Sequence, residues 1–204
     1  GQGQPEVGEM EGAPARLSEM AFEPGDHAYG PIHGTVEMRQ AVADYYNRLF
    51  RADKKSKYTA DNVSIASGGR LALSRAMFAL GGVNLGYQVP DYTAYEDMIG
   101  AHMHRCNPVV ITAKEENGFS VPPAHLEEEI KKNNLGAFLV SNPCNPTGAV
   151  IGGEDLNGWV RLGREYNCAL LLDECYSHFI YNEDGSPGPG PVSGAAYVDD
   201  VESD

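Results

Sequence analysis

Short apolar runs alternate with amphipathic stretches along residues 63–173. The runs predict strands, whereas the stretches between them repeat apolar residues every three to four positions and predict helices. The expected strands are 63–66, 86–89, 108–112, 137–141 and 168–173, and the expected helices are 70–80, 92–102, 123–133 and 154–166. This order indicates an α/β fold of three layers, with helices on both faces of a mainly parallel central sheet.

The segments before and after residues 63–173 differ from this region in composition and pattern. Residues 1–34 are rich in glycine and proline and predict an extended arm with turns. A helix follows, which Thr35 can cap and whose apolar residues recur at helical spacing, namely Val42, Tyr45, Tyr46, Leu49 and Phe50. The last residues are Gly/Pro-rich and then acidic. We therefore expect an arm and helix over 1–57, an α/β domain over 58–185 and a linker over 186–204.

The run 168–173 shows no polar alternation, so it predicts a strand covered on both faces and the most buried of the set. In sheets of this type, ligands bind beyond the carboxyl ends of the strands. The residues that follow each strand are therefore the first candidates for chemistry.

The amino-acid composition excludes several classes of binding partner. The chain has 15 Lys and Arg against 29 Asp and Glu, a net charge of −14, which argues against nucleic acid and anionic membranes. No apolar run approaches the roughly 20 residues of a membrane span, and residues 1–12 do not resemble a signal peptide. Four cysteines without C-x-x-C spacing indicate reduced thiols in a cytoplasmic protein. His102 and His104 lack further ligands at suitable spacing, so no metal site is expected.

The segment Ser67-Gly68-Gly69-Arg70 follows an expected strand and opens an expected helix. Bare N–H groups at a helix N-terminus, with glycines that allow close approach, can bind a phosphate. Taken alone, the segment is more simply interpreted as a tight strand–helix turn. It lacks the pattern of a nucleoside-triphosphate loop.

Three further motifs follow expected strands. Residues 142–148 read Asn-Pro-Cys-Asn-Pro-Thr-Gly, a rigid turn that can hold the Asn145 side chain over a ligand. Asp173 ends the last strand, where a carboxylate needs a cation or strong donors, and Tyr176 follows it. Tyr92, after Pro90, can stack on an aromatic ligand or simply belong to the core.

Together these motifs resemble the pyridoxal-phosphate enzymes of the aspartate aminotransferase fold (fold type I), class I and II aminotransferases in particular. The resemblance implies that Gly68, Gly69 and Arg70 hold the phosphate of pyridoxal 5′-phosphate, and that Tyr92 stacks on its ring. It extends over most of the chain, which would then be the N-terminal half of such an enzyme.

The same resemblance implies that Asp173 pairs with the ring nitrogen and that Asn145 and Tyr176 share the 3-oxygen. Tyr29 resembles the tyrosine that reaches the phosphate of a neighbouring subunit, which implies a homodimer with a shared active site. The segment Gly3-Gln4-Pro5 is similar to one that lines the substrate side. Residues 1–57 would belong to the small domain, whose C-terminal portion is absent.

The family's Schiff-base lysine has no counterpart here, because all six lysines precede Asp173 and none has the expected context. The expected function is amino transfer from an amino acid to a 2-oxo acid, with this chain inactive by itself. Alternatives are a lyase or cyclising enzyme of the same fold, a non-catalytic cofactor-binding module that lost the lysine, or a protein–protein scaffold.

Overall fold

The computed structural model of the protein describes residue 15 and residues 17–203. Contacts divide the chain into two units, residues 1–32 and 33–204, and each is described by itself. In the first unit, η1 (Pro24–His27) is a 3₁₀ turn, closed by a hydrogen bond from the backbone N–H of Glu23 to Asp26 Oδ2 (2.8 Å). The other described residues of this unit form no helix or strand, as expected for an arm with turns.

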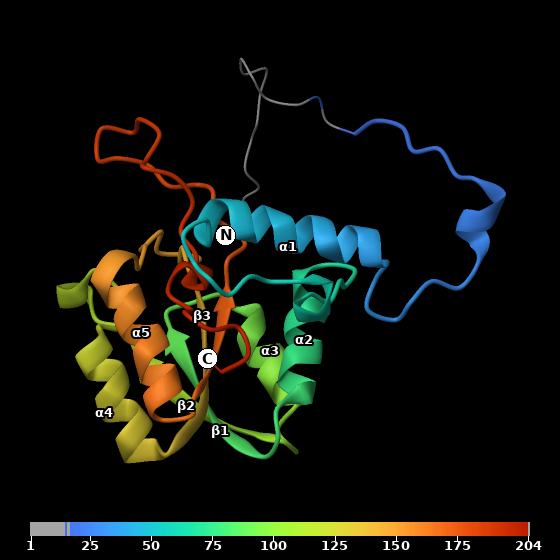
Figure 1. The fold of residues 1–204 in the computed structure, drawn as a ribbon. Coiled ribbons are helices and arrows are strands. Elements are labelled where there is room, and N and C mark those ends of the chain that lie inside the picture. Colours follow the sequence, from blue (N-terminus) through green and yellow to red (C-terminus); the bar gives the residue numbers. More distant parts are fainter. Residues whose placement is uncertain (1–14, 16, 204) are drawn as a thin grey trace. The chain divides into compact units, whose positions relative to one another are not determined.

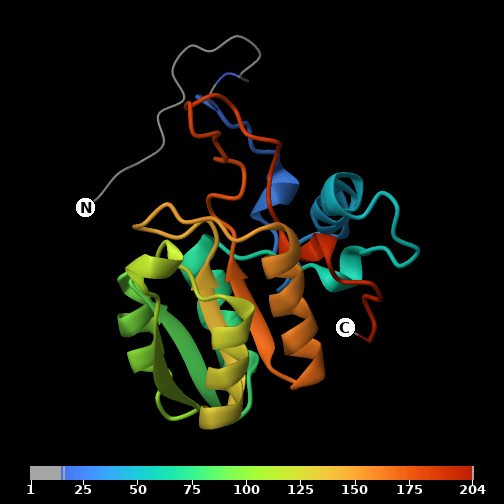
Figure 2. The ribbon, with the colours of Figure 1, turned by 90° about the vertical axis from the view of Figure 1, so that its left-hand side faces the viewer.

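Four parallel strands form the sheet of the second unit, in the order β2-β1-β3-β4 (Figure 2). Their bounds are Val83–Val89 for β1, Cys106–Thr112 for β2, Leu135–Ser141 for β3 and Ala169–Asp173 for β4. Ser141 pairs with Asp173 across the last two strands, so their carboxyl ends lie level. The prediction of a parallel sheet is confirmed.

Helices cover both faces of this sheet (Figure 1). On one face lie α2 (Gly69–Ala79) and α3 (Ala94–Ala101), and on the other lie α4 (Pro123–Asn133) and α5 (Gly153–Glu165). Each face has its own apolar core. Trp159 of α5 packs edge-on against Phe138 (5.5 Å between ring centroids), and Met77 of α2 packs with Leu85 on the other face. The three-layer α/β/α prediction is therefore confirmed.

Two predictions about strands are wrong. Residues 63–66 belong to no strand, because no described segment runs beside them as a ladder partner; the backbone N–H of Ile65 donates instead to the carbonyl of His33 (2.9 Å). The last strand is not the most buried one either. Leu171 and its neighbours in β4 are only half-buried because β4 lies at the edge of the sheet, whereas β3 is central and almost wholly buried.

Helix α1 (Val36–Phe50) precedes the sheet, and Thr35 caps it as predicted by accepting from the N–H of Met38 (3.3 Å). Its buried positions include Arg39 and Ala43, whereas Leu49, expected inward, is 41% exposed. Arg51, which follows the helix, is fully buried. Its guanidinium donates to carbonyl groups near the end of the described chain, and this holds residues 195–198 against the end of α1.

Gly158 offers a test of how closely α5 approaches α4. A Cβ on Gly158 would lie 2.8 Å from Pro123 Cγ, whereas a Cβ on Gly100 of α3 would meet nothing within 4 Å. Alanine favours a helix over glycine by about 1 kcal/mol, but forced overpacking costs about 1–3 kcal/mol. We expect Gly158→Ala to lower the free energy of unfolding by about 1–2 kcal/mol and Gly100→Ala to raise it, both measured by urea unfolding. Equal stabilisation by both changes would contradict the close contact.

Candidate active site

The carboxyl ends of β1, β3 and β4 bring the sequence motifs together. The strand order places these three strands side by side, so the segments that follow them are neighbours. The backbone N–H of Asn142, after β3, donates to the carbonyl of Asp173 at the end of β4 (2.9 Å). Side chains from both loops can therefore face one ligand, as is usual at this edge of a parallel sheet.

The N-terminus of α2 is open to a ligand. Gly68 caps it with φ +101°, a conformation that favours glycine, and nothing lies within 4 Å of the position of a Cβ. The first N–H groups of a helix have no partner within the helix, and the helix dipole is positive there. Gly68, Gly69 and Arg70 are exposed, so these groups can reach an anion.

Arg70 does not point away into solvent but toward Tyr92. Its Nε and Nη2 lie 3.0 and 2.5 Å from the Tyr92 hydroxyl, and its guanidinium carbon lies 5.5 Å from the ring centroid. A hydroxyl that accepts from a guanidinium is held in place, and so is the ring that carries it. Tyr92 is half-buried, so part of its surface remains open.

Asp173 is held by two donors. The hydroxyl of Tyr95, a buried residue of α3, donates to Asp173 Oδ2 (2.9 Å), and the N–H of Cys175 donates to Oδ1 (3.2 Å). Burial and the nearby Asp173 charge raise the pKa of Tyr95 above its ordinary value, so this hydroxyl keeps its proton and remains a donor. Tyr95 also packs edge-on against Tyr92, with ring centroids 5.5 Å apart.

The turn 142–148 is held by its first asparagine. The side chain of Asn142 is buried and makes a two-way pair with Ile151, donating to its carbonyl (2.8 Å) and accepting from its N–H (2.9 Å). Asn145 is half-buried, and its N–H donates to Ser141 Oγ (2.9 Å). Its side-chain amide makes no hydrogen bond to any described residue, so the amide is available to a ligand.

Sequence reasoning missed Asp91 as a site residue. The residue is 8% exposed, and its carboxylate accepts from the N–H of Tyr92 (2.7 Å), the N–H of Ser141 (3.1 Å) and the hydroxyl of Ser141. Burial raises the pKa of Asp91 from 3.8 to about 6. The available signal was an acidic residue directly after a strand, beside the tyrosine that did attract attention.

Comparison with known proteins decides the family. A sequence model described as aminotransferase class I and II matches residues 1–200. The chain belongs to the class I and II aminotransferases. Members of this family use pyridoxal phosphate as their cofactor.

Relatives of this aminotransferase chain are longer than the chain itself. Aspartate aminotransferase of Pyrococcus horikoshii is 32% identical over 167 residues, which are 80% of this chain and 40% of that protein. LL-diaminopimelate aminotransferase of Prochlorococcus marinus is 29% identical over 181 residues, 83% of this chain and 41% of that protein. The solved structure of Thermus thermophilus aspartate aminotransferase with maleate has a TM-score of 0.70 and 26% identity, covering 83% of this chain and 42% of that one. The chain thus spans about two fifths of the length of these relatives.

Some expected site residues of this aminotransferase chain are not joined to the others by any contact that the structure describes. The ring of Tyr176 packs edge-on against Phe179, with centroids 6.2 Å apart, rather than against another candidate residue. Tyr29 belongs to the first unit, so its place relative to the strand ends is not defined. The segment Gly3-Gln4-Pro5 lies outside the described residues.

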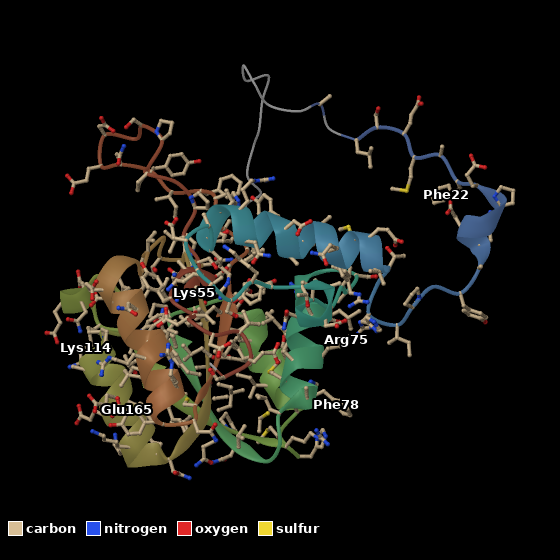
Figure 3. All side chains as sticks on the ribbon, viewed as in Figure 1. Phe22, Lys55, Arg75, Phe78, Lys114 and Glu165 are labelled. Carbon is tan, nitrogen blue, oxygen red and sulfur yellow. The ribbon has the colours of Figure 1, made fainter. Side chains whose placement is uncertain are left out.

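The lysines of this aminotransferase chain lie elsewhere in the fold. Lys55 is exposed after α1, and Lys114 lies in the turn after β2, where it pairs with Glu116 (3.4 Å) (Figure 3). The others make ion pairs or hydrogen bonds around the end of α1 or on α4, namely Lys54, Lys57, Lys131 and Lys132. No lysine follows β3 or β4.

A cavity of about 940 Å³ lies between α1, α5 and the edge strand β4, and its lining includes Glu174, which directly follows that strand. Its lining mixes apolar side chains with polar and charged ones, including Arg164 and Glu174, and Glu174 Oε1 accepts from the N–H of Gly194 (2.8 Å). The candidate active site is placed at the strand ends because the phosphate, ring and carboxylate motifs converge there.

Among the described residues, no helix is long and apolar enough to cross a membrane, and no three potential metal ligands gather.

The raised pKa of Asp91 predicts a pH dependence of stability in this member of the family. Between pH 3.8 and about 6, the folded protein holds the proton more tightly than the unfolded chain does. The free energy of unfolding therefore falls as pH rises through this window, by about 2–3 kcal/mol in total, and this contribution is constant above it.

We expect Asp91→Asn to remove that part of the dependence, measured as urea unfolding from pH 4 to 7. Burial also raises the pKa of Glu174, so a residual slope of the same sign remains in both proteins. Parallel curves for the two proteins would contradict the assignment to Asp91.

Proposed function

We propose that the protein containing this chain is a pyridoxal-phosphate-dependent aminotransferase that moves an amino group from an amino acid to a 2-oxo acid. The observation that carries the proposal is the position of Asp173. Its carboxylate is oriented by Tyr95 and Cys175 at the strand edge that also presents the Arg70–Tyr92 pair. Family membership supplies the reaction class.

The residues present fit the cofactor. The open N-terminus of α2, with Gly68, Gly69 and Arg70, suits a phosphate. The half-exposed ring of Tyr92 suits a stacked aromatic ring, and the unpartnered amide of Asn145 suits a ring oxygen. We assign Tyr176 to the same oxygen and Tyr29 to the phosphate of a neighbouring subunit, by resemblance to the family.

When bound, pyridoxal phosphate acts as an electron sink for the substrate's α-carbon. The role of Asp173 is to hold a proton at the ring nitrogen, which requires an ionised carboxylate in a fixed orientation. Tyr95 provides the orientation by donating to one carboxylate oxygen and leaving the group accessible. Arg70 fixes the hydroxyl of Tyr92 and so would limit how far the Tyr92 ring, assigned to stack on the cofactor, can move.

Amino transfer also needs a lysine to anchor the cofactor and move the proton at the α-carbon. Since no lysine of the chain follows β3 or β4, and Lys114, after β2, pairs with Glu116, we assign this role to polypeptide other than these 204 residues. On this proposal the chain is inactive by itself. Residues 58–185 would be the cofactor-binding domain, residues 1–57 would belong to a small domain, and residues 186–204 would be a linker, in a cytoplasmic homodimer.

Borohydride reduction followed by intact-mass measurement tests the proposal on the whole protein. We expect a covalent cofactor adduct and amino transfer that depends on an added 2-oxo acid. Aspartate and LL-diaminopimelate are the first donors to assay, because relatives are named for them. Release of ammonia and a 2-oxo acid without an acceptor would show a lyase instead. Reversible cofactor binding without an adduct would show a non-catalytic module.

A further inference from the structure

We propose that Asp91 is a positioning residue that ties the loop carrying Tyr92 to the turn carrying Asn145. The inference rests on the proposed function, because it concerns two residues assigned there to the cofactor. Asp91 itself is not assigned to face the ligand, since the residue is 8% exposed and its carboxylate is turned toward β3. It acts through the groups that it holds.

The Asp91 carboxylate accepts hydrogen bonds at the ends of two strands, β1 and β3. On the β1 side, Oδ1 accepts from the N–H of Tyr92 (2.7 Å), which fixes the backbone at the base of the stacking ring. On the β3 side, Oδ2 accepts from the N–H of Ser141 (3.1 Å). A hydrogen bond to an ionised group is stronger than one between neutral groups, so this bridge restrains both loops together.

Ser141 extends the bridge to Asn145. Its hydroxyl donates to Asp91 Oδ1 and accepts from the N–H of Asn145 (2.9 Å). A hydroxyl has one proton to donate, so donation to Asp91 turns its lone pairs toward the N–H of Asn145. The chain Tyr92–Asp91–Ser141–Asn145 therefore sets where the ring and the amide lie relative to each other.

The bridge works only with an ionised Asp91. Three donors converge on its two oxygens, and a proton on either oxygen would displace one of them. The titratable groups that face it are Asp173, at the end of β4, and Tyr95, on α3; both interact electrostatically with Asp91 across this edge. Asparagine at position 91 keeps the size of the side chain but replaces one acceptor by a donor.

Amide hydrogen exchange on the cofactor-free whole protein tests the bridge directly. We expect Asp91→Asn to reduce protection about tenfold or more at the amides of Tyr92, Ser141 and Asn145. Ser141→Ala should reduce protection at Asn145 while leaving Tyr92 held. Asp97→Asn, an exposed carboxylate on α3, is the matched control and should change neither segment.

Equilibrium binding of pyridoxal phosphate tests the consequence. We expect Asp91→Asn to raise the dissociation constant about tenfold and to change the circular dichroism of the bound cofactor, which reports ring orientation. Asp97→Asn should match the parent in both. If Asp91→Asn and the parent exchange alike and bind alike, the inference is overturned. If the parent itself does not bind the cofactor, the proposed function fails, while the exchange result still decides whether the bridge exists.

Discussion

Asp173→Asn in the whole protein should lower the rate constant of amino transfer by about a hundredfold to a thousandfold. The amide is the same size as the carboxylate and can still accept from Tyr95, but it carries no charge to hold a proton at the ring nitrogen. The protein should remain folded, because Asp173 is half-buried and both of its donors can be satisfied by an amide oxygen or by water. The measurement is kcat for 2-oxo-acid-dependent amino transfer, with the absorbance spectrum of the bound cofactor.

Two further variants sharpen this result. Tyr95→Phe leaves the charge but removes the donor that orients it, so we expect a smaller loss, about tenfold. Asp155→Asn, an exposed carboxylate in the first turn of α5, is the control and should leave kcat unchanged. An Asp173→Asn variant with the parent's kcat and spectrum would refute the assignment of Asp173 to the cofactor.

The second large effect concerns stability. Arg51→Met should lower the free energy of unfolding by about 3–5 kcal/mol, because three partly buried carbonyl groups lose their fully buried donor. The guanidinium donates to the carbonyls of Ala195 (3.0 Å), Val198 (2.6 Å) and Ser56 (2.7 Å), and lies 4.6 Å from the centroid of the Tyr58 ring. Methionine fills much of the volume but offers no N–H group.

Arg48→Met is the matched control on the same helix. Arg48 is exposed and its only described contact is with the ring of Tyr45, at 5.5 Å, so the change should cost less than about 1 kcal/mol. Chemical denaturation of the parent, Arg51→Met and Arg48→Met gives the change in the free energy of unfolding for each variant. Similar losses for Arg48→Met and Arg51→Met would show that the carbonyl cluster does not need its arginine.

Local signals explain which elements could be predicted from the sequence. The helix 123–133 is predictable to the residue, because Pro123 starts it, Leu126 and Ile130 mark its buried face, and Asn134 ends it in the left-handed region at φ +49°. The strand expected at 63–66 is wrong for the opposite reason. An apolar, β-branched run has the local preference for a strand, but a strand also requires a neighbour, and that is not a local property.

The candidate site shows the same division. The motifs locate Gly68, Tyr92, Asn145 and Asp173 because glycines, asparagine–proline steps and a charge after a strand are visible in the sequence. They do not reveal Asp91, because its importance comes from donors some fifty positions away on β3. In the sequence Arg51 is a cation near a helix end, whereas two of the three carbonyls that it binds belong to a segment more than a hundred positions later. When a polar group is buried against partners far away in the sequence, the residues around it do not indicate that it is buried.

The short segment from Asp91 to Tyr95 limits how the proposed cofactor site could be redesigned. Within five consecutive residues, it supplies the hydroxyl that Arg70 holds and the hydroxyl that holds Asp173. A substitution that shifts this segment would alter the contacts expected at both ends of the cofactor, so neither end can be tuned there independently. Selection experiments that seek altered cofactor use should therefore gain more from changes in the 142–148 turn. In that turn only the side chain of Asn145 is assigned to the cofactor.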